Sequence, residues 1–201
     1  MAYEFWKTIE GRRSVYAIGD EAVIPDEKVL ELVKNALKLA PSAFNSQSAR
    51  TLVLFGDAHK RLWNEVVANA LRGVMGGADF TATAEKLASF AAGRGTVLFF
   101  EDQAVVEGLQ NAFALYKDNF PVWSLQSSGM AQLTLWTALE AEGYGASLQH
   151  YNPLIDAEVA RIWNVPTSWK LWSQMVFGSV IEAPAPKQFA FSDAHVLTAD
   201  K

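Results

Sequence analysis

The segment APSAFNSQSAR, Ala40–Arg50, carries more hydrogen-bonding side chains than a connection between a helix and a strand needs. It holds three serines, an asparagine, a glutamine and an arginine around one aromatic residue, Phe44. Uncharged amides and hydroxyls suit the rim of a heterocycle or a polyol, because they offer donors and acceptors together. They are also typical of a solvated turn. From these residues alone, a binding loop and a plain surface loop both remain open.

A second candidate site is EGRRSVY, in which Arg12, Arg13 and Ser14 directly follow a glycine that ends a predicted helix. Two guanidinium groups and a hydroxyl provide donors suited to a phosphate. Adjacent arginines on a surface turn are more often simply solvated. Two weaker features come later: EGYGASLQHYN, whose glycines let a backbone approach a flat ring closely, and Lys187 in PAPKQ, a late cation.

Several familiar chemistries are excluded. The sequence has no G-x-x-x-x-G-K-[ST] phosphate loop and no G-x-S-x-G nucleophile elbow. GYGASL, from Gly143, lacks the third glycine of a dinucleotide fingerprint and precedes a predicted strand rather than following one. The three histidines, His59, His150 and His195, are scattered, so no zinc site is predicted.

Two other kinds of catalytic group are also disfavoured. Glu101 and Asp102 are neighbours on a predicted strand, so their side chains would point to opposite faces and would not form a carboxylate pair. The sequence contains no cysteine, which removes disulfides, thiolate nucleophiles and cysteine-ligated metals.

The composition is that of a globular protein. Of 201 residues, 50% are hydrophobic and 19% are charged, which argues against disorder. The formal charge of −5 gives no support to nucleic-acid binding, whose usual mark is a basic face. No apolar run is long enough to span a membrane, and the N-terminal MAYEFWKTIEGRRS lacks the core of a secretory signal. We expect one domain over residues 1–201, without a membrane partner, in the cytoplasm.

The predicted elements alternate irregularly between helix and strand, which favours an α+β layered domain over a doubly wound sheet. Apolar spacing and the Pro and Gly signals predict helices and strands as follows. Helices are expected over Tyr3–Glu10, Pro25–Ala40, Gly56–Val67, a segment ending at Phe90, a segment ending at Tyr116, Leu125–Ala141 and Pro153–Trp163, and strands over Arg50–Phe55, Gly95–Asp102, Gly145–Tyr151 and Lys170–Gly178.

The Leu125–Ala141 helix is apolar on more than one face, a pattern typical of a helix that is buried on more than one side. One of those sides could meet a partner subunit. After Gly178 the chain is rich in Pro and Ala and is expected to run as an extended arm.

In this order and at these distances, the candidate stretches resemble the nitroreductase family of FMN-dependent oxidoreductases. The similarity is greatest to its short branch, which includes the fatty-acid-repression-mutant proteins and related bacterial nitroreductases. It covers nearly the whole chain. The segments that carry it are RRSVY, PSAFNSQSAR, HKRLWN, FFED, EGYGASLQHYN and FG.

The resemblance implies a three-layer α+β domain with a mixed, mostly antiparallel central sheet. It also implies an obligate homodimer with two FMN sites at the interface. Residues matched to the phosphate of FMN are Arg12, Arg13, Ser14 and Lys187; those matched to a loop that reaches the flavin of the opposite protomer are Pro41, Ser42, Asn45 and Gln47; and those matched to the backbone beside the isoalloxazine ring are Gly145, Ala146, Ser147 and Leu148.

The implied activity is a ping-pong transfer of electrons from NAD(P)H through the flavin to a nitroaromatic or quinone acceptor, with no protein group acting as a catalytic acid or base. Two positions depart from the family pattern. Tyr16 stands where many relatives have Lys or Arg, and Phe189 stands where many have the Arg of a K-x-R pair. Two alternatives stay open, a flavin-binding redox sensor with little turnover and a flavin-free NAD(P)-dependent dehydrogenase.

Overall fold

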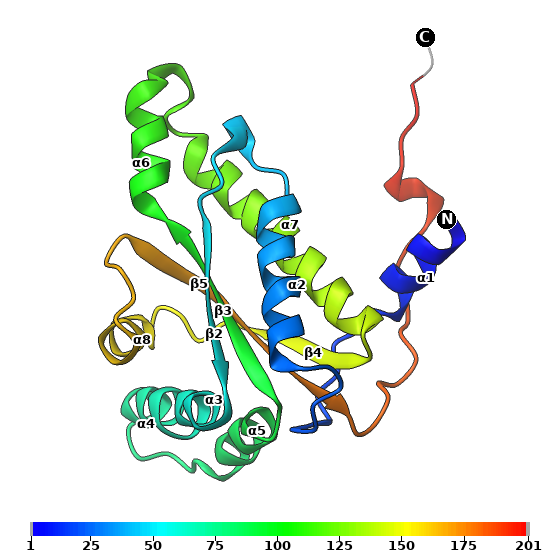
Figure 1. Cartoon of the computed structure of the whole chain (residues 1–201), viewed down its shortest axis with the longest axis vertical. Helices are drawn as coiled ribbons and strands as arrows, with labels where there is room; N and C mark the ends of the chain where they lie inside the picture. Colours follow the sequence, from blue (N-terminus) through cyan, green and yellow to red (C-terminus); the bar gives the residue numbers. More distant parts are fainter. Residues whose placement is uncertain (1, 200–201) are drawn as a thin grey trace.

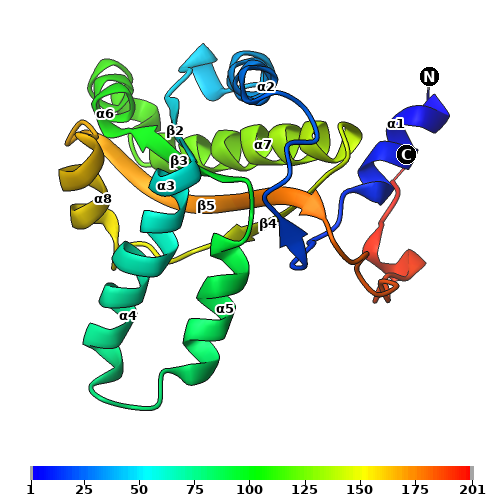
Figure 2. The same cartoon turned by 60° about the horizontal axis from the view of Figure 1, so that its bottom comes forward.

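The computed structural model describes residues 2–199, and it contains one five-stranded sheet between two layers of helices (Figures 1 and 2). The strand order is β1-β5-β3-β2, and β4 also pairs with β5. Every strand pair is antiparallel. The strands are β1 (Ile18–Gly19), β2 (Ala49–Phe55), β3 (Gly95–Asp102), β4 (Tyr144–Gln149) and β5 (Trp169–Val180). The expected α+β, three-layer class is confirmed.

The helical layers are drawn on the two faces of this sheet in Figure 2, with α2 and α7 on one side and α4 and α5 on the other. The α-helices are α1 (Ala2–Gly11), α2 (Asp26–Leu39), α3 (Gly56–Arg61), α4 (Ala68–Met75), α5 (Thr81–Ala91), α6 (Gln103–Ala112), α7 (Phe120–Ala141) and α8 (Asp156–Trp163). A π-helical turn (Leu62–Val67) joins α3 to α4, and short 3₁₀ turns cover Ala43–Asn45, Ala114–Tyr116 and Asp193–His195.

Alternate residues of the central strands serve two separate cores. Val97 and Phe99 of β3 pack with residues of α2 and α7, whereas Leu98 and Phe100 belong to the core under α3, α4, α5 and α8. Side chains on a strand point alternately to its two faces, so a strand covered on both faces needs a continuous apolar run. The sequence TVLFF provides such a run.

The start of α7 corrects the sequence prediction. The helix begins at Phe120 and not at Leu125, although Pro121 was expected to interrupt helical structure there. Pro121 lies in the first turn, where a backbone N–H has no partner within the helix, so its missing N–H costs nothing. The preceding helix, α6, ends at Ala112 rather than at Tyr116.

The apolar character of α7 on more than one face is confirmed. Leu135 and Leu139 are fully buried against the sheet, whereas Leu133 is 47% exposed in the single chain. Val122, Leu125 and Met130 are also exposed large hydrophobic residues of this helix. A stripe of this kind on a long helix is typical of a protein–protein contact.

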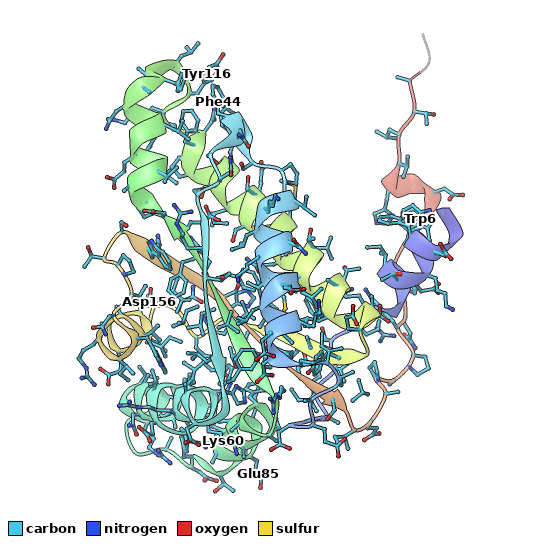
Figure 3. The ribbon with its side chains drawn as sticks, viewed as in Figure 1. Trp6, Phe44, Lys60, Glu85, Tyr116 and Asp156 are labelled. Carbon is cyan, nitrogen blue, oxygen red and sulfur yellow. The ribbon has the colours of Figure 1, made fainter. Side chains whose placement is uncertain are left out.

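The two ends of the described chain leave the layered body together. Figures 1 and 2 show α1 and the segment after β5 side by side, away from the sheet. Both expose large apolar side chains, among them Trp6, Phe189 and Leu197. Figure 3 shows Trp6 on α1 in this outlying region. Within residues 2–199, no helix combines the length and apolar content needed to cross a membrane.

Candidate functional site

Two of the sequence-predicted groups meet along the edge of β4. Ser14 forms a parallel bridge with Ala146, and the backbone N–H of Val15 donates to the carbonyl of Ala146 at 2.9 Å. The Arg12–Ser14 segment therefore runs beside Gly145–Leu148, although more than a hundred positions separate them in the chain. α1 ends at Gly11, which places both arginines in the connection between α1 and this edge.

A surface cavity of about 560 Å³ lies over this edge. It brings Lys187 to the arginine segment, as the sequence predicted. The residues that line it are Arg12, Arg13, Ser14, Tyr16, Ala17, Glu182, Ala183, Pro184, Ala185 and Lys187. Three cationic side chains and a hydroxyl stand against one carboxylate, that of Glu182, so the donor set fits a phosphate monoester.

Each cationic side chain is held by a neighbour. The guanidinium of Arg12 lies 4.6 Å from the centre of the Trp136 ring, and Nη2 of Arg13 donates to the carbonyl of Ala185 at 2.8 Å. The ammonium of Lys187 lies 5.1 Å from the centre of the Phe189 ring. Where many relatives have the Arg of a K-x-R pair, this chain therefore has the ring of Phe189, which contacts the ammonium of Lys187.

The glycine of β4 has a packing role that the sequence did not reveal. A Cβ atom at Gly145 would lie 2.8 Å from Cγ1 of Val15 and 3.1 Å from Cγ2 of Val180. Side chains of the two neighbouring segments therefore fill the space that glycine leaves. The predicted contact of this backbone with a flat ring stays a prediction.

The variant Gly145→Ala is expected to lower the free energy of unfolding by about 1–3 kcal/mol, because an added methyl group in a filled space forces its neighbours to move. Gly108→Ala is the matched control: Gly108 lies within α6 with nothing within 4 Å of its added Cβ. There, alanine should stabilise by about 0.5–1 kcal/mol. Thermal unfolding followed by circular dichroism measures both, and an unchanged melting temperature for Gly145→Ala would refute the packing role.

The polar loop after α2 adopts a strained backbone. Phe44, Asn45 and Gln47 have φ angles of 55°, 52° and 46°. Positive φ costs an ordinary side chain roughly 1–2 kcal/mol, and only Asn adopts it readily among these residue types. The loop is held by a bond from the backbone N–H of Gln47 to Oγ of Ser42 at 3.0 Å and by Nη1 of Arg50, which donates to the Gln47 carbonyl at 2.8 Å.

An aromatic cavity lies between this loop and the start of α7. Its volume is about 420 Å³, and it is lined by Pro41, Ser42, Ala43, Phe44, Trp123, Gln126, Ser127 and Met130. Phe44 is 49% exposed and its ring lies 6.1 Å from that of Trp123 in a stacked arrangement. Phe113, Tyr116 and Phe120 surround Phe44 as well. Figure 3 shows Phe44 and Tyr116 close together at this end of the molecule.

The loop and the cationic cavity do not meet within one chain. Arg12 contacts Trp136, whereas the loop contacts Trp123, near the other end of the same helix. At 1.5 Å per residue, these two positions on α7 are about 20 Å apart along the helix axis. Figure 1 shows the loop beyond the end of α2, far from the start of β4. Of the predicted residues, Pro41, Ser42, Asn45 and Gln47 thus form a separate group.

Sequence reasoning missed the aromatic cavity, although the concentration of aromatic residues from Phe113 to Trp123 could have indicated it. It was right about Glu101 and Asp102, whose side chains diverge. Glu101 is fully buried, and Asp102 instead accepts from Arg50 at 3.2 Å. What it did not reveal is that Glu101 lies beside the polar loop.

His59 lies in the core. It is fully buried, its Nδ1 lies 2.8 Å from Oγ1 of Thr96, and burial lowers its pKa to about 4. The ring is therefore neutral at pH 7. The same Oγ1 accepts from Nε1 of Trp63 at 2.9 Å. No group of three or more potential metal ligands occurs among the described residues.

Comparison with known proteins identifies the family of this chain. The model of the nitroreductase family matches residues 9–179. Nitroreductase FRM2 of Saccharomyces cerevisiae is 36% identical over 191 residues, which cover 92% of each chain. The nitroreductase CinD of Lactococcus lactis, solved with chloramphenicol, is 52% identical over 98% of this chain and 100% of its own, with a TM-score of 0.89.

The chain belongs to the nitroreductase family. CinD has also been solved with 4-nitrophenol, at 51% identity and a TM-score of 0.88 over 98% of this chain and 100% of its own. A more distant nitroreductase-like structure, from Desulfovibrio desulfuricans, contains FMN; it is 20% identical over 98% of this chain and 96% of its own, has a TM-score of 0.68, and shows the shared fold alone. The resemblance that the ordered motifs suggested is confirmed, and with it the nitroreductase fold.

Proposed function

We propose that this nitroreductase-family protein binds FMN and carries electrons from NAD(P)H to a nitroaromatic or quinone acceptor in a ping-pong cycle. The observation that carries the proposal is the cavity lined by Arg12, Arg13, Ser14 and Lys187, whose Ser14 is bridged to Ala146 of β4. Its charge suits the terminal phosphate of FMN.

When bound, FMN supplies the redox chemistry, accepting a hydride from the nicotinamide and passing electrons to the acceptor. The residues of the chain would then bind, orient and enclose the flavin. The arginines, Ser14 and Lys187 would hold the phosphate, and Gly145–Leu148 would lie beside the ring. Because no proton transfer by a side chain is required for hydride transfer, we assign no catalytic acid or base.

A homodimer would complete each site. The polar loop lies about 20 Å along α7 from the cationic cavity of its own chain, which favours a flavin held by a partner chain. The exposed apolar stripe of α7 and the apolar residues of α1 and the arm supply surface for such an interface. Two-fold pairing would bring the loop of each chain to the cavity of the other.

The aromatic cavity is then the place for the acceptor. Its walls, Phe44, Trp123 and Met130, suit a flat aromatic compound, since rings stack and the thioether of Met contacts aromatic edges favourably. The related CinD has been solved with two nitroaromatic compounds, chloramphenicol and 4-nitrophenol.

The assembly is tested by mass. Size-exclusion chromatography with light scattering is expected to give twice the 22.1 kDa of the chain, and the same mass after dilution to nanomolar concentration. Leu133→Glu, which puts a charge into the exposed stripe of α7, should shift the protein towards monomer and lower its flavin content. A wild-type monomer with full flavin content would overturn both the dimer and the shared site.

The activity is tested by the visible spectrum. The protein as isolated is expected to be yellow, with FMN as the cofactor identified by mass spectrometry after release. Anaerobic mixing with NADPH or NADH should bleach the flavin band rapidly, and addition of 4-nitrophenol or a benzoquinone should restore it. FAD in place of FMN would end this assignment. A flavin that stays oxidised with both nucleotides would instead leave the redox-sensor interpretation.

A further inference from the structure

Glu101 is a buried carboxylate beside the polar loop with only hydroxyl groups as hydrogen-bond donors. Its side chain has no exposed surface, and its Oε2 accepts from Oγ of Ser48 at 2.5 Å and from Oγ of Ser124 at 2.6 Å. Its Oε1 has no hydrogen-bond partner among the described residues. Burying a carboxylate in this way costs free energy unless the group is paired or well hydrogen-bonded. The positions of the Ser48 and Ser124 hydroxyls are therefore strongly constrained.

The two hydroxyls come from the two segments that supply the walls of the aromatic cavity, the polar loop and α7, although neither serine lines the cavity itself. Ser48 is the residue at which the polar loop enters β2, and its carbonyl accepts from the backbone N–H of Asp102 at 2.9 Å. Ser124 lies on α7 next to Trp123, which lines that cavity opposite Phe44. One carboxylate oxygen therefore ties the end of the loop to the helix that faces it.

The loop needs such a tie. Three successive or near-successive residues, Phe44, Asn45 and Gln47, hold positive φ angles, and such a conformation persists only where its surroundings determine it. The Ser42–Gln47 and Arg50–Gln47 bonds are partly or fully exposed, whereas both Ser48 and Glu101 are buried. Hydrogen bonds in a dry interior are stronger than those in water.

We propose that Glu101 is a positioning residue, which through Ser48 and Ser124 holds the strained loop in the conformation that presents Asn45 and Gln47 to the flavin. The inference rests on the proposed function, since it takes the loop to be part of an FMN site. Glu101 itself touches neither the loop amides nor a ring; it acts through the two serines.

The charged groups around Glu101 are few. Arg50 lowers its pKa, but that guanidinium already pairs with Asp102. Lys170 stands opposite in the register of β5, with its ammonium 4.4 Å from the centre of the Trp172 ring. α7 contributes the hydroxyls of Ser124 and Ser128, and the residues of α2 beside Ser48 are the apolar Leu37 and Ala40.

Burial is the main influence and raises the pKa of Glu101, while the three serine hydroxyls oppose it. Its neutral form is therefore reached at a higher pH than that of an ordinary glutamate. The hydrogen bond from Ser48 lowers the pKa, so a loop that releases Ser48 while Glu101 stays buried leaves the carboxyl with a higher pKa than the ordered loop does. Protonation favours the state with the higher pKa, so acid should loosen the loop in the wild-type protein. Glu101→Gln, which is nearly isosteric and does not titrate, should remove this dependence.

The test uses hydrogen–deuterium exchange of residues 42–47 in the full-length protein after removal of flavin, together with the affinity for added FMN. In Ser48→Ala, exchange protection of the loop at pH 7 is expected to fall five- to twentyfold, and FMN affinity to fall by the factor by which the ordered, binding-competent fraction of the loop decreases. Ser173→Ala is the control: it removes a buried hydroxyl that has no partner, and it should behave as wild type.

The pH profile supplies a second readout. FMN affinity of the wild type should fall more steeply between pH 7 and pH 5 than that of Glu101→Gln, whose affinity should be weaker and should change only as the FMN phosphate titrates. Unchanged loop protection in both Ser48→Ala and Glu101→Gln would overturn the inference even if FMN binds as proposed. A clearly smaller ordered fraction of the loop with unchanged FMN affinity would overturn it too. A wild-type protein that binds no FMN would instead defeat the proposed function, whatever the exchange shows.

Discussion

Replacing Arg12 by alanine is expected to weaken FMN binding by about ten- to a hundredfold. A hydrogen bond to a charged group contributes about 1.5–3 kcal/mol, and each 1.4 kcal/mol is a factor of ten in affinity. Arg12 lies in the cationic cavity and rests on the face of Trp136, so its fork is already oriented before a ligand arrives. The Arg12 side chain therefore loses less conformational entropy when FMN binds.

The dependence of FMN affinity on salt concentration distinguishes the loss of a positive charge from the loss of the planar guanidinium geometry. Titration of flavin-free protein with FMN in 50–500 mM KCl should give a flatter slope for Arg12→Ala than for the wild type, since screening acts on one cation fewer. Arg12→Lys keeps the charge but loses the planar fork, and its FMN affinity should lie between those of the wild type and Arg12→Ala.

Arg161→Ala is the matched control for this experiment. Arg161 is an exposed arginine paired with Glu158 on α8, away from the cationic cavity. Its loss should leave FMN affinity unchanged, because exposed pairs contribute little. If Arg12→Ala were no weaker than Arg161→Ala, the phosphate would have to be placed elsewhere.

A mixed dimer is expected to show one intact site and one site with two defects. One subunit carries Arg12→Ala and the other carries Asn45→Ala, and differently tagged subunits allow the heterodimer to be purified. If the loop crosses, the cavity of the Arg12→Ala subunit meets the altered loop of its partner. The other cavity keeps its arginine and receives a normal loop.

The magnitudes make the two patterns separable. Asn45→Ala alone removes one neutral hydrogen bond, about 0.5–1.5 kcal/mol, so it should cost severalfold to about tenfold. In the heterodimer, half of the sites should titrate with wild-type affinity, and the other half should be weakened by roughly the product of the two effects. Two weakened sites with no wild-type fraction would show that loop and arginines serve the same chain's flavin.

Local sequence signals predicted most helices and strands but missed β1 and α4, and some contacts that build the site are not local. RRSVY and GASL can be recognised separately, yet their adjacency depends on the Ser14–Ala146 bridge. Likewise, nothing in FFED indicates that Glu101 accepts from Ser48 and Ser124, which are 53 and 23 positions away. At Phe120 the error had a different cause: proline was taken as a breaker, although it is tolerated in a first turn.

Burial was also harder to foresee for small polar residues than for apolar ones. The run TVLFF predicts a buried strand by itself, because each residue favours the interior. Ser124 and Ser128 of α7 are buried although they are polar, and Ser124 donates to the buried carboxylate of Glu101 at 2.6 Å. The exposed stripe of α7 shows a different limit. An apolar pattern predicts that a helix face is covered, but it does not indicate which part of the protein or which partner covers it.

The central strand β5 is the last of the five described strands in chain order. β1, β3 and β4 all pair with it, and among these strands only the β2–β3 pairing is independent of it. During synthesis the sheet therefore cannot be completed until Val180 has been made, and closing such long-range pairs is slow. Because Lys187 lies beyond β5, the cationic cavity closes only after the whole sheet has emerged. FMN then binds to a sheet that is already complete and cannot serve as a template for the early steps, so overproduction should depend more on a slow rate of synthesis or on chaperones than on the supply of flavin.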